Sequence, residues 1–202
     1  MNGARRLLLL AQLAFWSCVL LCVAVTGGGL GHTHGFSVYG GRWTTIVPWA
    51  IGIAAAAVLV WRAADALADD DPLLARCLRV SVVLLVFILL TPDSIDQFFY
   101  VAHIVASVAL FLFQAVVGLW LVLQRRSTWV LPLYVLQIAA GLVAGASQAQ
   151  WIGLLSPGIL VFQLAFGALL YAVTSSRSAR SAVRSKPFGA RSPSRKSRET
   201  MQ

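Results

Sequence analysis

The sequence carries little charge. Charged residues make up 11% of its 202 residues, whereas a typical soluble domain has about 25%. Apolar residues make up 59% of the chain, which excludes an ordinary soluble globular domain. Three cysteines and seven prolines are too few for a disulfide-stapled scaffold or a proline-rich fibre. The composition therefore predicts an all-α, polytopic integral membrane protein.

Uncharged stretches locate the membrane spans. A helix needs about 20 apolar residues to cross the roughly 30 Å hydrocarbon layer. Five uncharged stretches approach or exceed this length, and the last is long enough to hold two helices. We therefore expect a bundle of six transmembrane helices. The predicted spans are residues 7–26, 45–62, 74–91, 98–123, 129–146 and 153–174.

Basic residues predict the orientation of the bundle. With six spans and the N-terminus inside, fifteen of the sixteen Lys and Arg residues fall on the cytoplasmic side. Arg42 alone falls outside. Omitting the short third span would invert the rest of the chain and place Arg125 and Arg126 outside, against the positive-inside rule. We therefore expect both termini in the cytoplasm. The excess of Arg over Lys and the abundance of alanine favour a cell (inner) membrane protein.

The C-terminal segment differs from the transmembrane domain, residues 1–173. Residues 174–202 carry eight basic residues, eight serines and one glutamate, a net charge of +7 out of a total of +9. A segment this polar cannot bury enough apolar surface to fold. We therefore expect a disordered cytoplasmic tail. We expect this basic tail to bind anionic lipid, while the transmembrane domain contacts the lipid bilayer. The overall positive charge is thus explained without nucleic-acid binding.

The middles of the predicted spans lack Asp, Glu, Lys and Arg. Ion-coupled transporters and proton pumps generally place an ionisable group near the membrane midplane. The absence of such charged groups from the middles of the spans disfavours coupled transport. Uncoupled passage of a small solute stays open.

The predicted fourth helix carries a polar stripe. An α-helix turns by about 100° about its axis at each residue. Measured from Asp96, the directions of four polar residues then agree within about 40°: Tyr100, His103, Ser107 and Gln114. A polar stripe inside a membrane must face protein or water rather than lipid. We therefore expect it to face the interior of the bundle.

Histidines and carboxylates are predicted to lie near the outer face. His32 and His34 fall in a glycine-rich outer loop, Asp93 and Asp96 precede the fourth helix, and His103 lies within it. Together these side chains suit a divalent metal, and paired histidines suit haem. In the simpler interpretation His103 packs between helices and Asp93 caps the fourth helix.

Glutamines are predicted at mid-depth in the last three helices. Gln114, Gln137 and Gln163 form a layer that can hydrogen-bond across helices or line a cavity. Gly141 and Gly145 form a G-x-x-x-G pair that predicts close packing of the fifth helix. Packing is the interpretation that we favour for both patterns.

The sequence thus favours a non-enzymatic multi-pass membrane protein. Such a protein would act by association with proteins or lipids, or by passing a small solute. The alternative hypothesis is a membrane redox or metal-binding protein with an outer-face site around His103.

Overall fold

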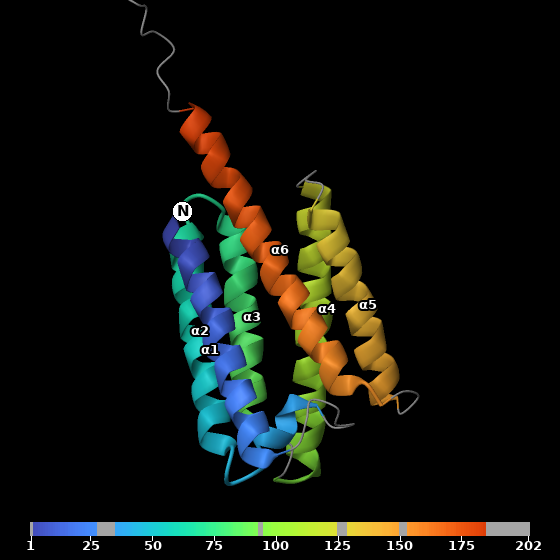
Figure 1. The fold of residues 1–202 in the computed structure, drawn as a ribbon. Coiled ribbons are helices and arrows are strands. Elements are labelled where there is room, and N and C mark those ends of the chain that lie inside the picture. The colour runs from blue at the N-terminus through green and yellow to red at the C-terminus, as the bar shows by residue number, and fades with distance from the viewer. Residues whose placement is uncertain (1, 28–34, 93–94, 125–128, 150–152, 185–202) are drawn as a thin grey trace, which may run out of the picture.

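Six α-helices form the fold (Figure 1). The computed structural model describes residues 2–27, 35–92, 95–124, 129–149 and 153–184. All six helices are long and apolar enough to cross a membrane, which confirms the predicted fold class and the third span. The elements are α1 (Asn2–Thr26), the 3-10 helix η1 (Phe36–Tyr39), α2 (Ile46–Leu67), α3 (Pro72–Leu90), α4 (Gln97–Gln124), α5 (Val130–Gln148) and α6 (Leu155–Arg184).

Several helices extend beyond the predicted spans. The start of α1, the end of α2 and above all the end of α6 lie outside them, because a helix can continue into the aqueous layer after its apolar segment ends. The apolar part of α6 stops at Thr174, as predicted, but the helix runs ten residues further, to Arg184. The first part of the basic tail is therefore helical. Residues 185–202 lie outside the described residues, so their disorder stays a prediction.

Local sequence signals set the helix ends. The Asp71 side chain caps α3 by accepting a hydrogen bond from the backbone nitrogen of Leu74 at 3.2 Å, and Pro72 follows in the first turn. Asp96 caps α4 by accepting from the nitrogen of Phe99 at 2.9 Å. The residue predicted for that cap, Asp93, lies three residues too early and outside the described residues. Gly27, which follows α1, adopts a φ of +62°.

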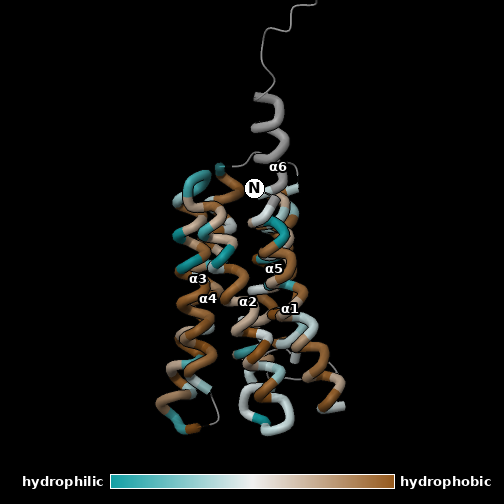
Figure 2. Tube along the Cα trace, turned by 90° about the vertical axis from the view of Figure 1, so that its left-hand side faces the viewer, coloured by the Kyte–Doolittle hydropathy of each residue, from teal (hydrophilic) through white to brown (hydrophobic). Residues whose placement is uncertain are grey.

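The helices form an antiparallel bundle in which each helix contacts its neighbour in sequence and α6 returns to α1. The N-terminus of α1 and the C-terminal part of α6 lie at one end of the bundle, which we call the terminal end (Figure 1). η1 lies at the opposite end, the η1 end. In Figure 2, apolar residues cover most of the helices, and hydrophilic ones gather toward the terminal end.

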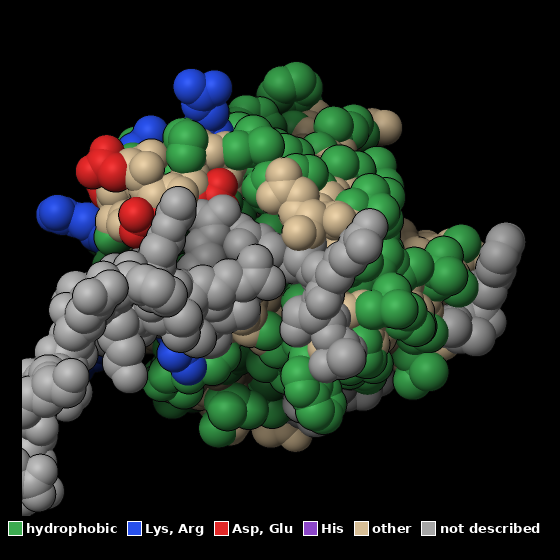
Figure 3. Space-filling model, turned by 90° about the horizontal axis from the view of Figure 1, so that it is seen from above, with side chains coloured by type: hydrophobic (Ala, Val, Ile, Leu, Met, Phe, Trp, Pro, Cys, Tyr) green, Lys and Arg blue, Asp and Glu red, His purple; other side chains and the backbone are tan. Residues whose placement is uncertain are grey.

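A packed core fills the terminal end. Leu8, Leu78, Leu121 and Leu169 belong to one buried cluster that joins α1, α3, α4 and α6. Charged side chains gather above this core over the α2–α3 turn (Figure 3). Outside the core, Asp65 and Arg79 form a 2.8 Å ion pair between α2 and α3.

A second, aromatic cluster occupies the η1 end. Phe36 and Tyr39 of η1 stack on each other and pack toward Trp49 of α2 and Trp16 of α1. Thr45 fixes the return of the chain by donating a 2.8 Å hydrogen bond to the carbonyl oxygen of Tyr39. η1 is therefore held against the ends of α1 and α2.

Candidate functional site

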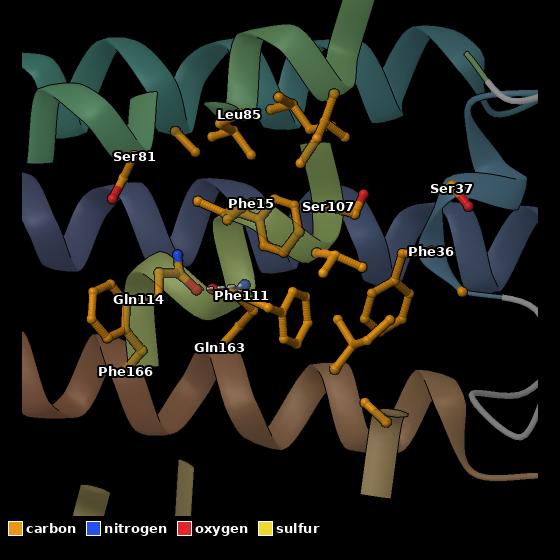
Figure 4. Close-up of a pocket in the computed structure, with 18 of the residues that line it drawn as sticks. Phe15, Phe36, Ser37, Ser81, Leu85, Ser107, Phe111, Gln114, Gln163 and Phe166 are labelled. Carbon is orange, nitrogen blue, oxygen red and sulfur yellow. Dashed lines mark hydrogen bonds between the residues drawn. The ribbon is translucent and has the colours of Figure 1, made fainter. Parts of the chain in front are cut away.

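A large cavity lies inside the bundle, between α1, α3, α4 and α6 and beneath η1 (Figure 4). Its volume is about 1250 Å³, above the roughly 300–1,000 Å³ of common small-molecule pockets. Phe15, Phe36 and Phe111 extend into it from three different elements (Figure 4). Most of its other lining side chains are aliphatic.

The polar stripe of α4 borders this cavity. Tyr100, His103, Ser107 and Gln114 all line it, in this order from the η1 end toward the middle of the bundle. Tyr100 is exposed, Ser107 is half-buried, and His103 and Gln114 are buried. Asp96 lies beyond the cavity on the exposed end of the helix, where its side chain caps α4.

Two amides bridge the cavity at its deep end. Gln163 Nε2 of α6 donates a 3.1 Å hydrogen bond to Gln114 Oε1 of α4 (Figure 4). This bond uses one donor and one acceptor, so the Gln114 NH₂ group and the Gln163 carbonyl oxygen retain hydrogen-bonding capacity. Both residues line the cavity. The pair therefore offers donor and acceptor groups without any charge.

A third glutamine lines the cavity from α1, beside α6. Gln12 of α1 accepts a 3.0 Å hydrogen bond from Trp16 Nε1 and lines the same cavity. Its amide rests on Gly167 of α6, where an added Cβ would lie 2.7 Å from Gln12 Cδ. Gly167 therefore allows α1 and α6 to approach at the level of this amide.

His103 is held by the end of α3. Its Nδ1 lies 2.7 Å from the carbonyl oxygen of Thr91, and the ring is buried. A carbonyl oxygen only accepts, so Nδ1 carries the hydrogen of this bond. This bond ties α4 to the C-terminus of α3. It supports the packing interpretation of His103 and leaves Nε2 as a nitrogen able to bind a metal.

The predicted metal ligands fall largely outside the structure. His32, His34 and Asp93 lie outside the described residues, so their approach to His103 stays a prediction. Within the part of the chain that the structure describes, no three His, Cys, Asp or Glu side chains gather as a metal-binding group. Of the two described candidates, Asp96 caps a helix and His103 bonds to Thr91.

Gln137 does not join the amide layer. It is 0% exposed, between α4 and α5, and neither its Oε1 nor its Nε2 has a hydrogen-bond partner among the described residues. The predicted layer therefore consists of one bonded pair, Gln114 and Gln163. Gln137 instead packs against Gly118, where a Cβ would lie 2.8 Å from Gln137 Oε1.

The G-x-x-x-G pair of α5 acts only in part as predicted. Gly141 packs closely on Phe162, because a Cβ added to Gly141 would lie 3.1 Å from Phe162 Cδ2. A Cβ added to Gly145 would meet no atom within 4 Å. A closer contact between α5 and α6 is made by Gly158, where a Cβ would lie 2.8 Å from the backbone nitrogen of Ala144. The small residue that matters most is thus on α6.

The two ends of the cavity differ. At the η1 end its lining includes exposed polar residues, among them Arg42 and Tyr100. At the other end its lining merges with the packed core through Leu8, Leu78 and Leu170. Among the described residues that line the cavity, Arg42 is the only one with a permanent charge. The cavity thus opens toward the η1 end and is closed toward the terminal end.

Sequence reasoning missed several of these lining residues. Gln12 is the one amide within the apolar run of the first helix, and that interruption was a usable signal. Phe15 and Phe111 are indistinguishable from ordinary apolar residues of a membrane helix. Only the packing of the bundle shows that they face the cavity.

The comparisons with known proteins add no further assignment. No family model matches the chain, and neither a curated protein nor a solved structure matches it.

Proposed function

We propose that this multi-pass membrane protein is a non-enzymatic binding protein or uncoupled carrier for a small uncharged molecule. The cavity in the bundle carries the proposal. Its wall combines aromatic side chains with a few amides and hydroxyls, the usual composition of a small-molecule site. Deeper than the exposed Arg42, a charged solute would lose its hydration without meeting a charged side chain of the described lining, which is costly in a low-dielectric interior.

The opening of the cavity at the η1 end would face the outside of the cell. The positive-inside distribution predicts that the η1 end faces outward, and the cavity opens toward that end. The packed core around Leu8 and Leu78 would then separate the ligand from the cytoplasm. Passage across the membrane would require this core to open.

Thiol accessibility tests the cavity and its orientation. We would replace Cys18, Cys22 and Cys77 by alanine, introduce Ser107→Cys, and treat intact cells with a membrane-impermeant methanethiosulfonate. Leu121→Cys in the packed core and Val116→Cys on the exposed face of α4 serve as controls. We expect Ser107→Cys to react at least tenfold faster than either control. A Ser107→Cys thiol that is sealed while Tyr100→Cys reacts would contradict an outward-open cavity.

A matched pair of solutes tests the charge selectivity. Benzamide and benzoate share a ring and differ in charge, and the amide group matches the Gln114–Gln163 pair. We expect millimolar benzamide to slow modification of Ser107→Cys and benzoate to leave the rate unchanged. Equal protection by both solutes, or by neither, would count against a site for uncharged ligands.

A further inference from the structure

The cavity also has an opening on the side of the bundle, between α4 and α5. At the terminal end these two helices touch, because a Cβ on Gly118 would lie 2.9 Å from Tyr134 Cδ2. Toward the η1 end they diverge (Figure 1). There α5 packs on α6 through Ala144 and Gly158, and Gly145 has open space where its Cβ would be. The divergence leaves a gap in the wall.

The residues at this gap belong both to the cavity and to the outer surface of the bundle. Val108 and Leu112 line the cavity, yet they are 50% and 63% exposed. They share a helix face with Val105 and Val116, which lie on the exposed surface of this apolar span. On the other side of the gap, Gly145 and Gln148 of α5 line the cavity. The gap therefore connects the cavity with the surface that meets lipid.

The interior behind the gap changes from apolar to polar. Phe111 stacks on Phe162 at 4.4 Å between ring centres, next to the opening. Gln114 lies six residues beyond Val108, about 9 Å further along the helix. A molecule entering from the lipid along the α4 side of the gap would thus meet the aliphatic and aromatic side chains of Val108, Leu112 and Phe111 first. The uncharged amides of Gln114 and Gln163 would come last.

From this arrangement we propose that the ligand is an uncharged, long-chain amphiphile that enters from the membrane between α4 and α5. Its hydroxyl or amide head binds the Gln114–Gln163 pair, and its alkyl chain extends through the gap toward the lipid. This inference rests on the proposed function of the cavity and specifies both its ligand class and its route. The ligand needs no charge, since the described lining has no ionic partner deeper than the exposed Arg42.

The test uses photolabelling of the full chain in nanodiscs. The probe is hexadecan-1-ol with a diazirine in the middle of its chain, and its adducts are mapped by mass spectrometry. We expect adducts concentrated on residues 104–112 of α4 and 141–148 of α5. Gly145→Phe, which fills the gap, should lower their yield at least fivefold. Leu142→Phe places the same side chain on the exposed face of α5 and should leave the yield unchanged.

A second pair of variants covers the case in which Gly145→Phe fails to fold. Leu112→Phe narrows the gap from α4, and Val116→Phe is its control outside the lining. Adducts spread over all lipid-facing side chains, and unaffected by either narrowing variant, would overturn the lateral route. If benzamide still protected Ser107→Cys in that case, the proposed function would stand and only the lipid-soluble ligand would be wrong. The corresponding carboxylic acid probe, charged at its head, should give at least fivefold fewer adducts.

Discussion

Gln163 of α6 donates a hydrogen bond to Gln114 of α4 across 3.1 Å, and this is the polar contact between the two helices at the deep end of the cavity. Both amides lie inside apolar spans. Hydrogen bonds between membrane helices contribute modest stability, because the unfolded chain in the bilayer finds other partners. The bond therefore positions the two amides in the cavity as well as stabilising the bundle.

A double-mutant cycle measures this bond. Gln114→Leu and Gln163→Leu should each destabilise the protein, and the double variant should recover a coupling free energy of about 0.6–2 kcal/mol. The measurement is unfolding in mixed micelles of increasing SDS content. Strictly additive effects of the two substitutions would show that the amides do not interact.

Gln137→Leu should have the opposite effect. The amide of Gln137 is fully buried and has no partner among the described residues. Replacing it by leucine removes an unsatisfied polar group at similar volume, which should stabilise the protein by about 1–3 kcal/mol. Gln163→Leu, which removes a bonded amide, is the matched control in the same unfolding assay. Destabilisation by Gln137→Leu would indicate a partner for this amide.

Two glycine substitutions should differ in sign. Gly158→Ala places a methyl group against the backbone of Ala144 and should destabilise the α5–α6 pair by about 1–3 kcal/mol. Gly145→Ala adds the same methyl group in open space and should stabilise α5 by up to about 1 kcal/mol through helix propensity. Thermal unfolding of both purified variants makes the comparison. Equal effects would contradict the close approach at Gly158.

His103→Phe separates the packing and metal interpretations. The substitution removes the donor to the Thr91 carbonyl, so we expect destabilisation of about 1–3 kcal/mol. His103→Gln keeps an N–H donor and should restore part of the loss. Metal analysis and the absorption spectrum are measured on the same samples. Stoichiometric metal or a Soret band in the parent protein, absent from His103→Phe, would favour the metal or haem hypothesis instead.

The sequence predicted the helices better than their contacts. The apolar runs predicted six spans, and all six are present as helices long and apolar enough to cross a membrane. The predicted first span begins after the start of α1, and the predicted second and sixth spans stop before the ends of α2 and α6. The difference arises because hydropathy measures the apolar segment rather than the helix. The backbone hydrogen bonds of a helix can continue beyond the apolar segment, because they do not depend on apolar side chains.

The candidate site was predictable only in part. Polar residues at helical spacing on α4 indicated an interior face, and four of the five line the cavity. Their periodicity could not show whether that face meets a packed helix or an open space. It also could not distinguish Gln114, which finds Gln163, from Gln137, which is buried without a described partner.

The sequence by itself determined the environment of the protein, the number of its spans and its predicted orientation, since these follow from where apolar and basic residues occur along the chain. The tertiary structure decided which small residues bring helices together and where they remain apart. Gly158 meets Ala144 while Gly145 faces open space, although both are glycines in apolar helices. Toward the η1 end α5 packs on α6 and diverges from α4, and this arrangement arises from contacts between residues distant in sequence (Figure 1).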